Sequence, residues 1–498
     1  MVKRLDSIGF DNQKYIATQS EQIRRRIEQF GGKLYLEFGG KLFDDYHAAR
    51  VLPGFAPDSK LRMLQQLQED VELLIAVNAA DIEKNKVRGD LGITYGDDVM
   101  RMIDMIRSLG LYVSSVVVTR YQGQSAADRF TERLTSLGIS CFHHYTIAGY
   151  PSDVARVVSE DALGRNDFIP TTRSLVVVTA PGPGSGKMAT CISQLYHDHR
   201  RGIKAGYAKF ETFPVWNLPL EHPVNLAYEA ATADLNDKNL IDPFHLAAYQ
   251  KTAVNYNRDI EIFPVLSAIF RQIQGDSPYQ SPTDMGVNMA GMCIVNDTVC
   301  REAAQREILR RYYTACVEHT QGKAGEEPVR RLEMIMQRCG VTPAVNPAVA
   351  ASLQKAEETC APAGAMVLPD GRMVTGKTSV ALGAASALLL NAIKAVGGID
   401  DQLDLISSQV LEPVCRLKTE YMGHKNPRLH TDEVLMALTI SALTNPLAKL
   451  AQKQLPKLRG SDAHFSVILS DEDVNFLRQL GINVTCEPQY ETNQFYHK

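Results

Sequence analysis

The feature that most constrains the fold is an alternation of short apolar runs with helix-like segments between residues 17 and 200. Polar stretches of helical length separate the apolar runs, which are Leu34–Phe38, Glu72–Asn78, Ser114–Arg120, Cys141–Ile147 and Ser174–Thr179. Continuous apolar strands that alternate with helices are typical of a parallel sheet covered on both faces. The sequence therefore predicts an α/β fold with a mostly parallel sheet in its N-terminal part.

A chain of 498 residues is too long for one hydrophobic core, because single cores stop growing near about 250–300 residues. We expect an α/β phosphate-binding region over 1–295, with a further division near 170 as one option. A mainly helical domain over 296–460 and an α/β tail over 461–498, packed on a sheet, follow. The helices of the middle part are expected at 301–316, 380–395, 402–421 and 431–453, and the strands of the tail at 465–469 and 483–486.

Composition excludes several classes of partner. The net charge is only −4, which gives no electrostatic basis for binding nucleic acid or an anionic membrane. The N-terminus has no apolar signal segment, and the longest apolar stretch, Val380–Ile393, is shorter than the ~20 residues of a membrane span. The nine cysteines are scattered and contain no Cys-x-x-Cys pattern, which favours reduced thiols. We therefore expect a cytoplasmic protein with a small-molecule substrate.

The clearest chemical motif follows the run Ser174–Thr179. The residues Gly182-Pro-Gly-Ser-Gly-Lys187 connect this strand to a helix expected over Met188–Arg200. Glycines let backbone N–H groups approach phosphate oxygens, and the N-terminus of a helix adds partial positive charge. Lys187 supplies a mobile positive charge. The motif predicts a phosphate site made by its own members, Gly182, Gly184, Ser185, Gly186 and Lys187.

The match to a nucleotide P-loop is incomplete at both ends. Pro181 stands where the pattern has its first glycine, and Met188 stands where it has Ser or Thr. That hydroxyl normally holds Mg²⁺. Ser185 or Thr190 can replace it, or carboxylates and the nucleotide itself can hold the metal.

A second string, Gly371–Thr378, satisfies the pattern G-x-x-x-x-G-K-T letter for letter. Its context differs, because Pro369-Asp370-Gly371 is typical of a turn between two short strands and apolar residues separate the glycines. We predict that this string is no nucleotide loop, although Lys377 can serve an anion site at the start of a helix over 378–395.

Two further segments carry candidate functional residues. Gly39-Gly40 follows the first strand, and Lys41 and Arg50 come after it, where they can lie near an anion at the rim of the sheet. The polar loop Ser281–Asn288 contains Asp284, which can hold Mg²⁺ or accept a proton. Both segments are equally compatible with capped turns that carry surface charges.

A local stretch resembles P-loop ligases of the dethiobiotin synthetase type. The resemblance consists of a strand, a Gly-rich loop with Lys187, a helix, and then Ala205-Gly-Tyr-Ala-Lys209. It covers about 40 residues, and it implies that Lys209 lies near the phosphates of ATP in an ATP-dependent ligase.

A second resemblance covers nearly the whole chain and points to a bacterial family of uncharacterised proteins, described only as a domain of unknown function. It rests on the strings Phe38–Gly54, Thr179–Lys187, Lys209–Pro214, Ser281–Asn288 and Gly481–Thr485. The family implies an α/β N-terminal part and a helical C-terminal part, and it supplies no reaction.

Together these patterns favour a nucleotide-binding enzyme, an ATP-dependent ligase or phosphoryl transferase acting on a small polar metabolite. In that hypothesis Lys187 and its loop bind phosphates, Asp284 holds Mg²⁺, and Lys41, Arg50 and Lys209 line the acceptor side. One alternative is an enzyme that binds a phosphorylated sugar or a phosphate-bearing cofactor without ATP. Another is a nucleotide-sensing scaffold that assembles through the helical part, and a homo-oligomer is expected in either case.

Overall fold

The structure is a computed structural model that describes residues 7–43, 45–88, 92–235 and 237–492. The chain forms two compact units. The N-terminal unit consists of Gly9–Tyr228 and Asp237–Asp297, and the C-terminal unit consists mainly of Thr298–Lys498, with Glu229–Asn236 and the first residues. The domain limits expected at 295 and 460 stay predictions.

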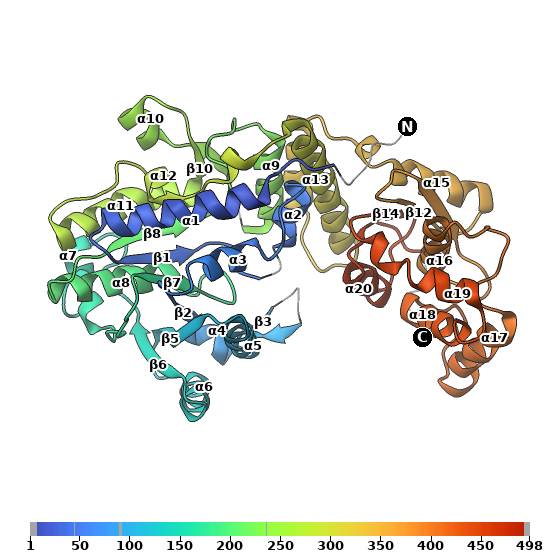
Figure 1. Ribbon diagram of the computed structural model, residues 1–498, viewed down its shortest axis with the longest axis horizontal. Helices are drawn as coiled ribbons and strands as arrows, with labels where there is room; N and C mark the ends of the chain where they lie inside the picture. The colour runs from blue at the N-terminus through green and yellow to red at the C-terminus, as the bar shows by residue number, and fades with distance from the viewer. Residues whose placement is uncertain (1–6, 44, 89–91, 236, 493–498) are drawn as a thin grey trace. The chain divides into compact units, whose positions relative to one another are not determined.

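The N-terminal unit is built on a seven-stranded sheet in the order β11-β8-β1-β7-β2-β5-β6, and every neighbouring pair in it is parallel (Figure 1). The α/β class and the mostly parallel sheet are thereby confirmed. The strands are β1 (Leu34–Phe38), β2 (Val71–Asn78), β5 (Tyr112–Tyr121), β6 (Ser140–Tyr145), β7 (Leu175–Thr179), β8 (Gly206–Phe210) and β11 (Gly286–Val287).

Strands β1 and β8 share one sequence pattern and pair with each other in register. β1 reads Leu-Tyr-Leu-Glu-Phe and β8 reads Gly-Tyr-Ala-Lys-Phe, so that Glu37 lies beside Lys209. The rings of Phe38 and Phe210 stack with centroids 4.2 Å apart. The pairing therefore buries an aromatic pair next to two opposite charges at the carboxyl ends of these strands.

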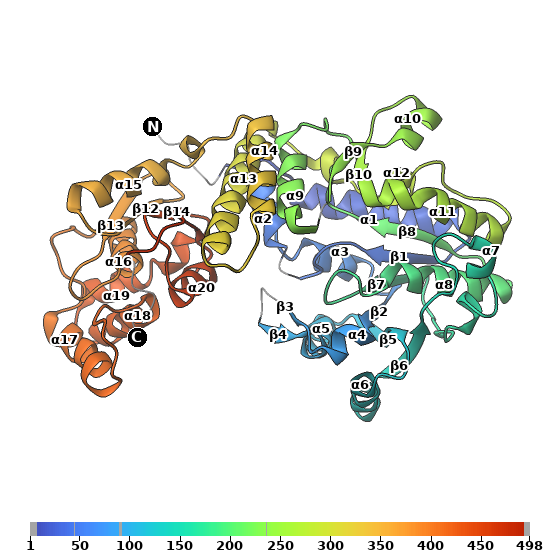
Figure 2. The ribbon, with the colours of Figure 1, turned by 180° about the vertical axis from the view of Figure 1, so that it is seen from behind.

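Helices cover both faces of this sheet. Figures 1 and 2 show α1 (Asn12–Gln29) and α3 (Ser59–Gln66) on one face and α8 (Lys187–Arg200) and α11 (Asn257–Gln274) on the other. The core under α8 and α11 contains alternate residues of the strands, including Leu74, Ala76, Val176 and Val178. This two-sided burial explains why the strands are continuous apolar runs.

The path of the chain places the Gly-rich loop at a crevice of the sheet. The connection after β2 leads to β5, whereas the connection after β7 leads through α8 to β8 on the opposite side. Adjacent strands whose connections leave in opposite directions open a crevice at their carboxyl ends, where ligands bind in open α/β sheets. The loop after β7 lies at this switch point.

Shorter helices and strands complete the N-terminal unit. The helices are α2 (Tyr46–Val51), α4 (Ala79–Glu83), α5 (Tyr95–Ser108), α6 (Ser125–Ser136), α7 (Val154–Val157), α10 (Pro243–Tyr249) and α12 (Pro282–Met285), and α9 (Pro223–Ala231) reaches into the C-terminal unit. Two small antiparallel pairs are made by β3 (Val87–Arg88) with β4 (Ile93–Thr94) and by β9 (Asn239–Ile241) with β10 (Val254–Tyr256).

The C-terminal unit contains a four-stranded sheet in the order β13-β12-β14-β15. Its strands are β12 (Ala363–Val367), β13 (Met373–Lys377), β14 (Asp462–Phe465) and β15 (Asn483–Cys486). Its helices are α13 (Asp297–Thr320), α14 (Glu327–Arg338), α15 (Pro347–Thr359), α16 (Ala384–Gly397), α17 (Ser408–Arg416), α18 (Thr431–Ser441), α19 (Pro446–Gln452) and α20 (Asp471–Gln479).

Several sequence expectations in this unit had inaccurate limits, and one of them is the helix expected over 378–395, which begins only at Ala384. The helix expected over 431–453 is divided, because Pro446 begins α19 and Asn445 caps its Leu447 N–H at 2.9 Å. The helix expected from 402 begins only at Ser408, and the strand expected at 465–469 lies earlier, at Asp462–Phe465. Proline at the first position of a helix is a strong start signal, which explains the division.

The string Gly371–Thr378 forms a turn and strand β13, with no helix directly behind its Gly-Lys pair. Gly376 is buried in the strand, and a Cβ atom on it would overlap the backbone of Leu388 on α16. The glycine therefore serves close packing of helix on strand.

Among the described residues, no helix has the length and apolar character that crossing a membrane requires.

This packing role predicts that Gly376→Ala destabilises the protein, because the added methyl group has no space. We expect a loss of about 1–3 kcal/mol, as for other overpacked sites, in urea unfolding followed by circular dichroism. Gly325→Ala is the matched control, since nothing lies within 4 Å of a Cβ there. Equal stabilities of the two variants would contradict the packing role.

Candidate functional site

The Gly-rich loop is fixed by contacts with the neighbouring strands. Gly184 and Gly186 have φ angles of +75° and +85°, a region that glycine enters without steric cost. The Thr119 hydroxyl at the end of β5 donates to the Ser185 carbonyl at 2.8 Å, and the Asn78 amide at the end of β2 donates to the Gly184 carbonyl at 3.4 Å. The loop carbonyls are thus turned toward the sheet.

The N–H groups of this loop have no comparable partners. In the described ranges, no acceptor is found for the backbone N–H groups from Gly184 to Ala189, and the N-terminus of α8 has no side-chain cap. Successive free N–H groups in turns with left-handed residues form a concave anion-binding nest. The 14-residue helix α8 begins at the same place and adds the positive end of its dipole.

Lys187 is the first residue of α8, and its side chain is half-buried. Its ammonium group makes no hydrogen bond or ion pair with any residue that the structure describes. Burial lowers the pKa of Lys187, and the nearby Lys209 lowers it further, while Glu37 acts in the opposite direction. An anion bound at the loop would offset the cost of burying the charged ammonium group of Lys187.

The two hydroxyl groups of the loop region, on Ser185 and Thr190, are engaged with loop carbonyls. The fully buried Ser185 hydroxyl donates to the Gly182 carbonyl at 2.9 Å, and the fully buried Thr190 hydroxyl donates to the Gly186 carbonyl at 3.0 Å. Both therefore stabilise the loop itself. Met188 occupies the position at which a P-loop has its metal-binding Ser or Thr.

A buried cluster of charges lies beside the loop, at the carboxyl ends of β1 and β8. The Lys209 ammonium forms ion pairs with Glu211 at 2.8 Å and with Asp259, and it lies 4.8 Å from the ring centre of Tyr256. Burial lowers the pKa of Lys209, but Asp259 and Glu211 outweigh it, so the net shift is upward. Lys209 is thus a fixed cation that its two carboxylates already balance.

Glu37 completes this cluster on the side of β1. Its carboxylate accepts a hydrogen bond from the Tyr207 hydroxyl at 2.6 Å. Burial first, and then the charge of Glu37, raise the pKa of that hydroxyl well above its ordinary value. Because Glu37 also acts on the titration of Lys187, the cluster and the loop form one electrostatic neighbourhood.

A cavity of about 170 Å³ opens on the other side of β8, at the edge strand β11. Its polar lining comes from five elements and includes Arg26 of α1, Glu211 after β8, His245 of α10, Asn255 of β10 and Asp284 of α12. Trp216 provides an aromatic wall. The cavity therefore combines acidic, basic and aromatic side chains in a small space.

The residues predicted from the sequence fall into separate places in this arrangement. The loop follows β7, whereas Asp284 lines the cavity at β11, which β8 and β1 separate from β7. Lys209 of β8 lies next to β11 and pairs with Glu211 of the cavity lining. Three strand spacings correspond to about 14 Å. Asp284 accepts hydrogen bonds from the Tyr249 hydroxyl at 2.9 Å and the Gln280 N–H at 3.1 Å. A metal role for Asp284 stays a prediction.

Lys41 and Arg50 follow β1 at the same edge as the loop, with Lys41 exposed and Arg50 half-buried on α2. The ammonium that enters this turn belongs to Lys60 of α3, which donates to the Lys41 carbonyl at 3.1 Å and pairs with Asp45 at 2.8 Å. Sequence reasoning missed it. Lys60 stands at helical spacing from three buried apolar residues, Met63, Leu64 and Leu67. This spacing indicates that Lys60 lies on the buried face of its helix.

The chain is similar to known proteins over nearly its whole length. A model of the domain of unknown function DUF1846, N-terminal, matches residues 8–340, and a model of its C-terminal part matches residues 344–496. A UPF0371 protein of Streptococcus pyogenes serotype M5 (strain Manfredo) is 54% identical over 494 residues, which are 99% of this chain and 100% of the relative. A UPF0371 protein of Streptococcus equi subsp. equi (strain 4047) is 54% identical over 492 residues with the same coverage.

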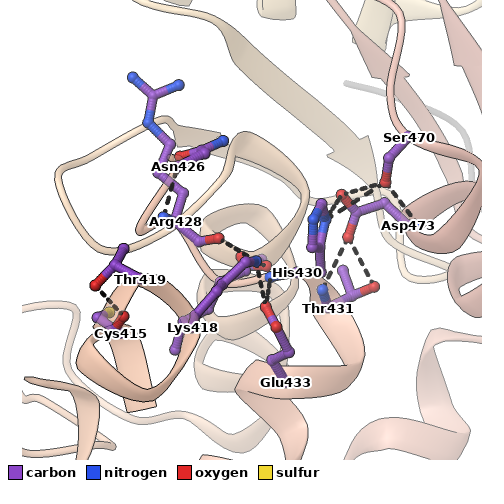
Figure 3. A network of polar contacts seen from close by, with 12 residues as sticks. Cys415, Lys418, Thr419, Asn426, Arg428, His430, Thr431, Glu433, Ser470 and Asp473 are labelled. Carbon is purple, nitrogen blue, oxygen red and sulfur yellow. Dashed lines mark hydrogen bonds and ion pairs between the residues drawn. The ribbon is translucent and has the colours of Figure 1, made fainter. Parts of the chain in front are cut away.

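A second polar network lies in the C-terminal unit and contains Ser, His and Asp (Figure 3). The Asp473 carboxylate and the Ser470 hydroxyl both approach Nδ1 of His430, at 3.0 and 3.4 Å, and Ser470 also donates to Asp473 at 3.1 Å. A nucleophile would need the other ring nitrogen of the histidine. Ser470 caps α20 and His430 caps α18, so this network joins the starts of two helices.

The His430–Asp473 pair predicts a pH-dependent contribution to stability. The hydrogen bond to Asp473 raises the pKa of His430. A group whose pKa is raised by folding stabilises fully below its unfolded pKa, and this contribution disappears as the pH rises through the folded pKa. His430→Gln should therefore lower the melting temperature more at pH 5.5 than at pH 9, measured by calorimetry. A loss that is equal at both pH values would contradict the charged pair.

Proposed function

Because this chain belongs to the DUF1846 family, whose description names no activity, we propose its function from the site at the sheet edge. The protein is an enzyme that binds the phosphate groups of a nucleotide at Gly182–Lys187 and uses them in ligation or phosphoryl transfer to a small polar metabolite. One observation carries this proposal: a row of N–H groups for which the described residues offer no acceptor lies at the start of α8, where Lys187 is the first residue.

Each part of the loop has a role in this proposal. The N–H groups of Gly184, Ser185 and Gly186 donate to phosphate oxygens, and Lys187 neutralises their charge. The resemblance of the stretch up to Lys209 to dethiobiotin synthetase-type ligases supports a nucleotide. Because Lys209 is already balanced by two carboxylates, we assign it to orienting Glu211 and Asp259 next to the bound ligand.

A second candidate is an enzyme that binds a phosphorylated sugar or a phosphate-bearing cofactor without Mg²⁺. Two observations favour it: the loop hydroxyls of Ser185 and Thr190 are both buried and engaged with loop carbonyls, and Asp284 lies three strands from β7. A phosphomonoester needs donors and positive charge more than it needs a metal.

A nucleotide-sensing scaffold without turnover is the alternative to both enzymes, and a cytoplasmic location and a homo-oligomer belong to the proposal in each case. Turnover of a nucleotide would contradict the scaffold. Light scattering with and without nucleotide tests the oligomer, because a sensing scaffold should change its mass on binding, whereas an enzyme of fixed assembly should not.

The phosphate site predicts that Lys187→Ala weakens the binding of ATP at least tenfold, because the loop loses its only side-chain cation. Isothermal titration with ATP, with and without Mg²⁺, and with glucose 6-phosphate measures this effect and separates the two candidates. The matched control is Lys84→Ala, an exposed lysine of the same unit. Unchanged affinity of the Lys187 variant for every one of these ligands would rule out the site.

The nest itself predicts a separate effect of Gly184→Ala. A left-handed residue with a Cβ costs about 1–2 kcal/mol, and the loop can relieve this strain by turning its N–H groups away. Gly202→Ala is the matched control, because Gly202 also has a positive φ and nothing lies within 4 Å of its Cβ position. Both variants should lose similar stability in urea unfolding, but only Gly184→Ala should lose phosphate affinity. Equal affinities would show that the loop N–H groups bind no phosphate.

A further inference from the structure

The cavity at β11 is separate from the phosphate loop and has a chemistry of its own. Its volume of about 170 Å³ corresponds to about five or six water-sized groups, at roughly 30 Å³ each. It is lined by the segment after β8, by both sides of β11 and by α1, α10 and β10. The cavity has room for a small polar molecule.

Two carboxylates in the lining have an oxygen to spare. Glu211 is 7% exposed, and its Oε1 is held by Lys209 at 2.8 Å, whereas its Oε2 accepts no hydrogen bond from the described residues. Asp284 uses Oδ2 for Tyr249 and Gln280. Its Oδ1 has His245 Nδ1 at 3.7 Å, which is too long for a hydrogen bond. The cavity therefore offers two negatively charged acceptors.

The donors of the lining are largely occupied by protein groups. Arg26 donates from Nη1 to Gln29 at 3.2 Å and from Nη2 to the backbone carbonyl of Asp284. The Trp216 indole N–H donates to the Asn288 carbonyl at 2.9 Å, and Trp216 also lines the cavity. Oε2 of Glu211 and Oδ1 of Asp284 accept no hydrogen bond from the described residues, while Arg26, whose buried Nε has no partner there, lines the same cavity.

We propose that this cavity binds a small primary amine in its ammonium form, held by Oε2 of Glu211 and Oδ1 of Asp284 and flanked by the ring of Trp216. An ammonium group has three N–H donors and no acceptor, so it can donate to both carboxylate oxygens. The proposal of this binding site depends only on the residues that line the cavity.

The surroundings of Glu211 act on its titration from both directions. Burial and Asp259 raise the pKa of Glu211 to about 7, although Lys209 acts against them. A cation bound at Oε2 would act in the same direction as Lys209 and favour the ionised carboxylate. Tyr256, Lys209 and Asp259 also face this carboxylate.

The test is titration of the full chain at pH 8 with ethanolamine, measured by isothermal calorimetry. Ethylene glycol and acetate are the probes of similar size that lack the positive charge. The proposal expects saturable binding of ethanolamine and no binding of the other two. Glu211→Gln should weaken it at least tenfold, and Asp284→Asn should weaken it as well. Glu69→Gln, an exposed glutamate of the same unit, is the matched control and should bind as the parent chain does.

Absence of ethanolamine binding, stronger binding of acetate, or equal affinity in Glu211→Gln and the parent chain would overturn the amine site. If Glu211→Gln does not fold, as judged by its melting temperature, Asp284→Asn tests the amine site. It removes the negative charge of the second carboxylate, whose side chain is only half-buried. The titration contains no nucleotide. A negative result therefore overturns the amine site and leaves the phosphate site to Lys187→Ala.

Discussion

The parallel pairing of β1 with β8 is the constraint on which the candidate site depends. It stacks Phe38 on Phe210 and places Glu37 beside Lys209 at the carboxyl ends of the strands. Lys209 can be buried there only because Glu211 and Asp259 balance its charge, since an unpaired charge in such a place costs several kcal/mol. A slip of β8 by one residue against β1 would turn Lys209 to the face of the sheet opposite Glu37.

This pairing also relates the two candidate ligand sites. β7, which leads into the Gly-rich loop, lies on one side of β1, and β11, which borders the cavity, lies on the other side of β8. The charges of the central pair therefore face both sites, as the influence of Glu37 on Lys187 and of Lys209 on Glu211 indicates.

The sequence predicted the parts of the fold that have a local signal. Five of the seven strands of the N-terminal sheet, β1, β2, β5, β6 and β7, were recognised from their apolar runs, and β1 agrees with its predicted limits. The strands β8 and β11 were not predicted. The rest could not be predicted because it depends on partners distant in the chain. The Lys60–Asp45 pair and the cavity at Glu211 arise from elements that meet only in the folded unit. The division between α18 and α19 did have a local signal, since Asn445-Pro446 is typical of a helix start.

The two strings that resemble a P-loop show why physical context decides the interpretation of a motif. Gly371–Thr378 has every required letter, but its second glycine is packed under α16 and its lysine ends a strand. Gly182–Lys187 departs from the pattern at both ends, yet it has left-handed glycines, free N–H groups and a lysine at a helix start. What a phosphate requires is converging donors with little desolvation cost. The letters Ser or Thr after the lysine serve the metal, so their absence bears on Mg²⁺ and not on the proposed phosphate site.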